Sequence, residues 1–250
     1  MIQRVVALGA SNLTRGFGTV VATSRALWGS DVQVVAALGH GRSYGGDSFF
    51  LTRKLPGILE SGLWRHLESA PPRETRALVT DVGNDIAYGY TADQIIGWVD
   101  EAIDRLTRVT TDITVTDLPL ATMRRLTPLK FLAFRSLLLP SCRLSLDQVL
   151  DTAGRVNTGL VSLARSRGVK LVRLKPDWYG VDPIHIRPSL WHSAWCEILG
   201  ADDSSRNGRS AFEQWRLYLM PPERQWLFGV ERVRPQSGVQ LPAGGRVWLY

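Results

Sequence analysis

Four separate segments of the sequence carry side chains that together suit nucleophilic acyl transfer. They supply a hydroxyl, a glycine-rich run of backbone N–H groups, a side-chain amide, and a carboxylate with an imidazole: Gly9-Ala10-Ser11-Asn12, Gly39-His40-Gly41-Arg42-Ser43-Tyr44-Gly45, Gly83-Asn84-Asp85 and Asp182-Pro183-Ile184-His185. A serine hydroxyl is a weak nucleophile until a base takes its proton, and an imidazole, with a pKa of about 6.5, does so at neutral pH. A carboxylate fixes the tautomer of the imidazole and stabilises its cation.

These requirements predict Ser11 as the nucleophile, His185 as the base and Asp182 as the residue that orients the base. Each residue taken alone also has a structural explanation, because Ser11 suits a helix N-cap and His185 suits a packed position in the core. The three groups favour the catalytic interpretation when taken together, since Ser11 follows the first predicted strand and Asp182 and His185 come well after the fifth, at the edge where such segments converge.

An oxyanion formed during acyl transfer needs fixed hydrogen-bond donors. The sequence predicts the backbone N–H of Ser11, the backbone N–H of Gly41 and the side-chain amide of Asn84 in this role. Gly39 and Gly45 stay open as alternatives to Gly41, since all three glycines lie in the same segment.

The elements that must position these residues follow from hydrophobic patterning. Apolar, β-branched runs predict five buried strands, at 5–8, 32–38, 77–82, 113–118 and 169–174. Amphipathic spacing predicts helices between them, at 18–28, 55–67, 91–106 and 145–167, with Gly168 ending the last. This alternation indicates a doubly wound parallel sheet, in which the carboxyl ends of the strands meet at one edge.

Two regions depart from the alternation. Residues 123–140 predict an extra helix over the sheet edge that would act as a lid, with an ordinary crossover helix as the alternative. After Gly200 a polar segment at 201–208 indicates a linker, followed by a helix at 211–220 and a β-hairpin at 225–250. We therefore predict a domain at 1–200 and an extension at 201–250, which packs on the domain or forms a homodimer contact.

The four segments, in this order, resemble the motifs of the SGNH/GDSL hydrolase family, and the resemblance spans roughly residues 3 to 200. It implies a three-layer α/β/α sandwich with a five-stranded, flavodoxin-like parallel sheet. It also implies a serine hydrolase of carboxylic esters, acyl or acetyl, that needs no metal or organic cofactor.

One residue departs from the family motif. The family has Gly-Asp-Ser-Leu at the nucleophile, whereas this chain reads Gly9-Ala10-Ser11-Asn12-Leu13, so the acid beside the serine is missing. The alternative function is therefore a catalytically weak module of the same fold that binds a carbohydrate or acyl ligand. A nucleotide-binding protein is disfavoured, because the glycine spacing at 39–45 does not fit Gly-x-Gly-x-x-Gly.

Three residues near the motifs are tentative substrate contacts. Arg42 and Arg187 would favour an anionic group on the substrate if they point inward, and Trp178 could stack on a sugar or line an acyl pocket. Core packing is the more common fate of Trp178 and its neighbours Trp191 and Trp195. The expected substrate is a small-molecule or carbohydrate-linked ester.

Composition excludes several classes of protein. The formal net charge is +7, but no basic run of five residues and no nucleic-acid-binding motif accompanies it, so nucleic-acid binding is disfavoured. Cys142 and Cys196 lack metal-ligand spacing and are either free thiols or one disulfide. The chain has no signal-peptide pattern and no apolar run of roughly 18 to 20 residues, so we expect no membrane span and a cytoplasmic location.

Overall fold

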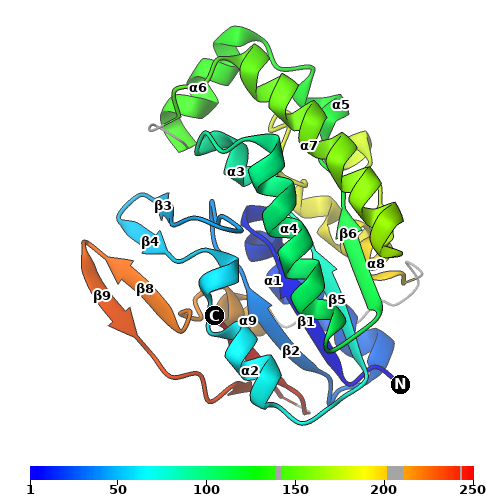
Figure 1. The fold of residues 1–250 in the computed structure, drawn as a ribbon. Helices are drawn as coiled ribbons and strands as arrows, with labels where there is room; N and C mark the ends of the chain where they lie inside the picture. The colour runs from blue at the N-terminus through cyan, green and yellow to red at the C-terminus, as the bar shows by residue number, and fades with distance from the viewer. Residues whose placement is uncertain (139–141, 202–210, 243) are drawn as a thin grey trace.

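A computed structural model describes residues 1–138, 142–201, 211–242 and 244–250, and it is built on a seven-stranded sheet (Figure 1). The strand order is β10-β11-β2-β1-β5-β6-β7, and every neighbouring pair is parallel except β10 with β11. The strands are β1 (Arg4–Leu8), β2 (Gln33–Ala37), β5 (Thr75–Val79), β6 (Asp112–Thr116), β7 (Lys170–Val172), β10 (Val239–Gln240) and β11 (Arg246–Leu249).

The five strands predicted from the sequence are neighbours in this sheet and extend to its β7 edge. Their order, second, first, third, fourth and fifth, is the flavodoxin-like order in which ligands bind beyond the carboxyl ends of the strands. The prediction of five strands is corrected to seven, because β11 pairs in parallel with β2 and brings β10 with it.

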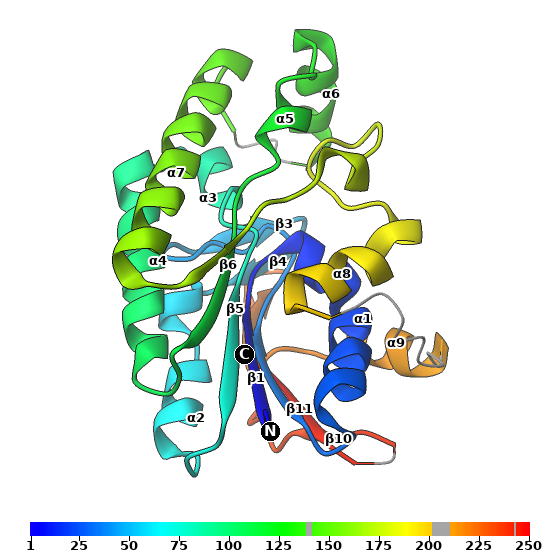
Figure 2. The ribbon, with the colours of Figure 1, turned by 90° about the vertical axis from the view of Figure 1, so that its right-hand side faces the viewer.

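Helices cover both faces of the sheet (Figure 2). One face carries α1 (Ser11–Trp28), α8 (Trp191–Leu199) and α9 (Ala211–Tyr218), and the other carries α2 (Leu63–Ser69), α4 (Ala92–Thr107) and α7 (Leu146–Arg167). A separate buried apolar cluster lies on each side of the sheet. The molecule is therefore the expected three-layer α/β/α sandwich.

Local sequence signals explain where these helices begin and end. Thr91 caps α4 in a capping box with Gln94, and Ser145 caps α7 in the same way with Gln148. Gly168 ends α7 in the left-handed conformation, with φ of 64°. Both predicted helices are confirmed at these boundaries, whereas α1 begins at Ser11, seven residues before the predicted start at 18.

The predicted helix at 55–67 is wrong. This stretch contains the end of β4 (Arg53–Leu55), a 3-10 turn (Ile58–Glu60) and the start of α2. The N–H groups of Ile58 and Leu59 donate to the carbonyls of Ser43 and Tyr44, both at 3.0 Å, instead of to a helix. The apolar stripe is real, but long-range hydrogen bonds to the glycine-rich segment replace the first helical turns.

The predicted single hairpin at 225–250 is also wrong. Strands β8 (Arg224–Leu227) and β9 (Val230–Val233) extend a hairpin of β3 (Ser48–Phe50) and β4 into a second, antiparallel sheet of order β3-β4-β8-β9. Pro235 follows β9 and cannot donate to a strand ladder, so the chain leaves this sheet and returns to the central one as β10 and β11. The division of the chain at residue 200 stays a prediction.

The insert at 123–140 contains a helix, as predicted. The short α5 (Leu120–Met123) leads into α6 (Pro128–Leu138), and both lie beyond the carboxyl ends of the strands (Figures 1 and 2). The end of the insert at 139–140 and most of the predicted linker, 202–208, fall outside the described residues.

Candidate active site

Ser11, His185 and Asp182 form one hydrogen-bonded chain. Ser11 opens α1 directly after β1, and its Oγ lies 2.9 Å from Nε2 of His185. Nδ1 of the same ring lies 2.6 Å from Oδ2 of Asp182. Ser11 and His185 are 8% and 6% exposed, whereas the side chain of Asp182 is 35% exposed, so the hydroxyl and the imidazole are shielded from bulk water and the carboxylate is partly solvated.

The loop that carries the imidazole is held by its own carboxylate. Oδ1 of Asp182 accepts hydrogen bonds from the N–H groups of Ile184, at 3.1 Å, and His185, at 3.2 Å. Burial alone would raise the pKa of Asp182, but the contact with His185 and these two N–H groups outweigh it and hold the pKa below its usual range. The carboxylate therefore stays charged at neutral pH, as orienting an imidazole requires.

Asn12 fastens this loop to the helix that carries Ser11. Its Nδ2 donates to the carbonyl of Ile184 at 2.8 Å, and its Oδ1 accepts from the N–H of Ile186 at 2.8 Å. The two bonds grip the backbone on either side of His185. Sequence reasoning missed this role, although an amide directly after the predicted nucleophile was the available signal.

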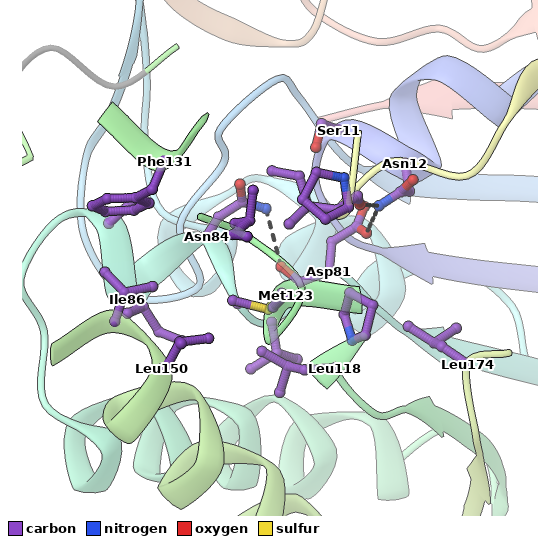
Figure 3. A pocket seen from close by; sticks show the side chains of 18 of the residues that line it. Ser11, Asn12, Asp81, Asn84, Ile86, Leu118, Met123, Phe131, Leu150 and Leu174 are labelled. Atoms are coloured by element: carbon purple, nitrogen blue, oxygen red, sulfur yellow. Dashed lines mark hydrogen bonds between the residues drawn. The ribbon is translucent and has the colours of Figure 1, made fainter. Parts of the chain in front are cut away.

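Asp81 supplies a carboxylate at the start of α1 (Figure 3). Its Oδ2 accepts from the N–H groups of Ala10, at 2.9 Å, and Leu13, at 3.0 Å, and its Oδ1 accepts from Nδ2 of Asn12 at 3.0 Å. The first N–H groups of a helix lack partners within the helix, and a negative charge there is stabilising. Asp81, two residues after the end of β5, thus places a carboxylate beside Ala10, where the sequence lacks the acid of the family motif.

Of the predicted oxyanion donors, Asn84 lines the same pocket as Ser11, and Gly41 lies in the loop that follows β2. Gly41 adopts φ of 68°, its carbonyl accepts from Tyr88 Oη at 2.7 Å, and its N–H has no acceptor among the described residues. Nδ2 of Asn84 donates to the carbonyl of Asp81 at 3.1 Å, which fixes the orientation of the amide. Of the alternatives, a Cβ on Gly45 would lie 2.1 Å from the ring of Trp98, so that glycine faces the core.

Asp85 joins the loops after the second and third predicted strands. The hydroxyl of Ser43 donates to its Oδ1, and the N–H of Tyr44 donates to its Oδ2 at 3.1 Å. Burial raises the pKa of Asp85 to about 6, although these two hydrogen bonds act in the opposite direction. Asp85 is therefore a structural tie that holds the Gly41 loop in place rather than a surface turn residue.

A mostly apolar pocket extends from Ser11 and Asn84 (Figure 3). It encloses a cavity of about 140 Å³ between the carboxyl ends of the strands and the helices α3 (Asn84–Ala87), α5, α6 and α7. Its apolar wall is formed mainly by Val82, Ile86, Leu118, Met123, Leu126, Phe131, Leu146, Val149, Leu150 and Leu174. Charged side chains reach it only as Asp81, Asp117 and Arg135 among the described residues.

The three tentative substrate contacts do not line this pocket. Arg42 is fully buried and donates to the carbonyls of Leu38, Pro56 and Tyr250, and burial together with nearby Arg53 lowers its pKa to about 9.

The other two contacts are corrected in the same way. Trp178 is 5% exposed and packs in the core, as does the fully buried Trp195. Arg187 is exposed and donates to the carbonyl of Asp177.

The structure also bears on the two cysteines, on clusters of metal-ligating side chains and on helices that could span a membrane. Cys142 and Cys196 are not joined in a disulfide. Within the described ranges, no three His, Cys, Asp or Glu side chains cluster in a way that could hold a metal ion. No described helix is both long enough and apolar enough to cross a bilayer.

The architecture matches solved structures of esterases. The inhibitor-bound aryl esterase of M. smegmatis superposes with a TM-score of 0.54 at 14% identity, over 79% of this chain and 97% of the esterase. The chain has the SGNH/GDSL hydrolase fold.

Two further solved structures are similar to the chain over comparable lengths. The lipolytic G-D-S-L protein of Veillonella parvula has a TM-score of 0.48 at 12% identity, over 78% of this chain and 94% of that protein. The esterase EstA of Pseudoalteromonas sp. has a TM-score of 0.49 at 10% identity, over 79% and 94%. No protein-family model and no curated protein sequence matches the chain.

Proposed function

We propose that this protein is a serine hydrolase of the SGNH/GDSL family that cleaves carboxylic esters. The observation that carries the proposal is the chain from Ser11 Oγ to His185 Nε2, 2.9 Å, and from His185 Nδ1 to Asp182 Oδ2, 2.6 Å, beside an apolar pocket. A hydroxyl, an imidazole and a carboxylate in this geometry are what acyl transfer through a serine requires.

In the proposed reaction Ser11 Oγ attacks the ester carbonyl while His185 Nε2 takes the hydroxyl proton. The oxyanion is bound by the N–H groups of Ser11 and Gly41 and by the amide of Asn84. The free N–H of Gly41 and the fixed amide of Asn84 support these assignments. His185 then protonates the leaving alcohol, and a water molecule, deprotonated by His185, releases the acid from Ser11.

The pocket favours an ester with an apolar acyl group. Its wall is mostly apolar, and burying an apolar chain contributes roughly 0.8 kcal/mol per methylene group. The alcohol part, a small molecule or a carbohydrate, would then lie outside the pocket. The weak binding module considered from the sequence was suggested by Ala10 and the aromatic C-terminal segment, and the carboxylate of Asp81 beside Ala10 favours the hydrolase over it.

The test is hydrolysis of a short p-nitrophenyl ester and covalent labelling by a fluorophosphonate. Ser11→Ala should lower kcat by about a thousandfold or more and abolish labelling while the unfolding temperature is retained. Ser166→Ala, on the exposed side of α7, is the matched control and should leave both unchanged. Wild-type protein that neither hydrolyses esters nor reacts with the probe would refute the proposal.

A further inference from the structure

The second sheet exposes an unusual set of apolar side chains at its two turns. Leu51, in the turn between β3 and β4, is 86% exposed, and Phe228, between β8 and β9, is 80% exposed. The turns adjoin, because the N–H of Phe228 donates to the carbonyl of Thr52 at 2.9 Å. Figure 1 shows both hairpins on the same side of the molecule, with their turns directed away from the central sheet. We call this the turn surface, formed by Leu51, Phe228 and Val230, which lie in or directly beside the two turns.

Both turn residues hold a backbone conformation that bulky side chains disfavour. Leu51 has φ of 55° and Phe228 has φ of 52°, in a region where Gly, Asn and Asp are the usual residues. Ordinary turn residues would be more soluble and less strained at these positions. Neither the turn conformation nor packing within the described chain favours Leu51 and Phe228, so a contact with something outside the chain would account for large apolar side chains at these positions.

The two hairpins that carry these apolar side chains are rich in cations, of which Lys54 pairs with Asp47 and Arg224 with Glu231, each at 2.6 Å. The segments 47–55 and 224–234 contain five Arg or Lys and two Asp or Glu, a formal charge of +3. Lys54 Nζ and the Arg224 guanidinium lie 4.7 and 4.9 Å from the ring centre of Trp226. Arg232 and Arg234 have no carboxylate within ion-pair distance in the part of the chain that the structure describes.

We propose that the turn surface docks on an anionic lipid bilayer. A membrane interface suits protruding Leu and Phe side chains in hairpins that also carry Lys and Arg. The apolar groups would enter the acyl boundary, and the cations would bind acidic headgroups. Two copies of a surface with a charge of +3 repel each other, which disfavours self-association. A flat sugar site would not need the aliphatic Leu51 and Val230 at convex turns.

The turn surface lies next to the proposed oxyanion loop. The hydroxyl of Tyr88 contacts both the carbonyl of Gly41, at 2.7 Å, and that of Phe49, at 3.4 Å. The ring of Phe50 stacks on His40, with centroids 5.1 Å apart. Docking would thus place a bilayer beside the loop that binds the ester carbonyl. That a lipid ester then reaches Ser11 rests on the proposed function, whereas the docking itself does not.

The experiment is flotation of the full chain with vesicles of phosphatidylcholine alone and mixed with phosphatidylglycerol. Wild-type protein should float with the anionic vesicles, and added salt should weaken this binding severalfold. The double substitution Leu51→Asn and Phe228→Asn should lower the partition coefficient about tenfold or more. Asn tolerates the left-handed conformation, so this variant should remain folded.

Two controls keep the outcomes distinct. Leu129→Asn removes an apolar side chain that is 78% exposed on α6 and should leave flotation unchanged. The double variant should hydrolyse a water-soluble ester as fast as wild type. Absence of wild-type flotation, or flotation that survives the double substitution, overturns the docking proposal. So does a solution dimer that the double substitution dissociates, since a second copy would then cover the surface. Absence of ester hydrolysis by the wild-type protein would instead refute the proposed function.

Discussion

Removing the side chain of Asn12 tests whether the loop that carries His185 is held by the helix that carries Ser11. Asn12→Ala deletes the bonds to the carbonyl of Ile184, the N–H of Ile186 and the carboxylate of Asp81. Each bond contributes a net stabilisation of about 1 kcal/mol, so the three together contribute about 3 kcal/mol. Asn12 is only partly buried, and water can replace part of this, so we expect a loss of about 2 kcal/mol.

The effect on catalysis should be larger than the effect on stability. A loss of about 2 kcal/mol lowers the unfolding temperature of a chain of this size by roughly 4 to 8 °C, which leaves it folded at 25 °C. Displacement of a catalytic group by about 1 Å can cost about a hundredfold in rate. We therefore expect kcat for p-nitrophenyl butyrate to fall about a hundredfold in Asn12→Ala, with KM little changed.

The matched control is Thr158→Ala, which removes one hydrogen bond from the exposed face of α7, to the carbonyl of Gly154. It should lower stability slightly and leave kcat unchanged. An Asn12→Ala protein that keeps kcat within about threefold of wild type would show that the His185 loop holds its position without the amide.

Two further predictions concern the pH dependence of stability and the pocket. Burial raises the pKa of Asp85 from 3.8 to about 6. Between these two pH values Asp85 is protonated in the folded state and ionised in the unfolded state. The free energy of unfolding should therefore fall by up to about 3 kcal/mol as the pH rises from about 4 to 6. Asp85→Asn keeps an acceptor for the N–H of Tyr44 and should remove this part of the slope in urea unfolding at a series of pH values; an unchanged slope would show that another group causes it. Leu150→Trp should fill the pocket and lower kcat/KM for an octanoyl ester by about tenfold or more relative to the acetyl ester, whereas Leu132→Trp, on the half-exposed side of α6, should not; equal losses on both esters would place the acyl chain elsewhere.

The central fold could be predicted from sequence because its signals are local. The five buried strands are apolar runs, and the capping boxes at Thr91 and Ser145 lie within single turns of their helices. The stretch at 55–67 misled because an amphipathic stripe does not reveal that Ile58 and Leu59 bond to the carbonyls of Ser43 and Tyr44. Periodicity reports which side chains are buried, and it does not report where the backbone hydrogen bonds go.

Some residues of the candidate site could likewise be predicted from local sequence, and others could not. Ser11, Asp182 and His185 were predicted from residue type and order, and the structure brings them within hydrogen-bond distance. Asp81 was missed because its value lies in contacts with Ala10 and Leu13, about seventy residues away in the chain. The absence of an acid at position 10 suggested a less active serine. The sequence alone does not show that Asp81, just after β5, places its carboxylate beside Ala10.

The arginine prediction failed for a different physical reason. Arg42 lies in the segment that carries Gly41, but the carbonyls of Leu38, Pro56 and Tyr250 draw its guanidinium inward. A long flexible side chain takes its direction from its surroundings, which residue type does not encode.

The parallel pairing of β11 with β2 has a consequence for how the protein reaches its folded state. Arg246 lies opposite Gln33, so this pair joins segments from near the two ends of the described chain. Such non-local parallel contacts form slowly, because the entropy of closing a long loop is lost before the contact is made. The α4 and α7 layer has more local contacts and can form earlier. During refolding, a compact species with this helical layer in place and no closed β2 edge should precede the species that can bind an ester.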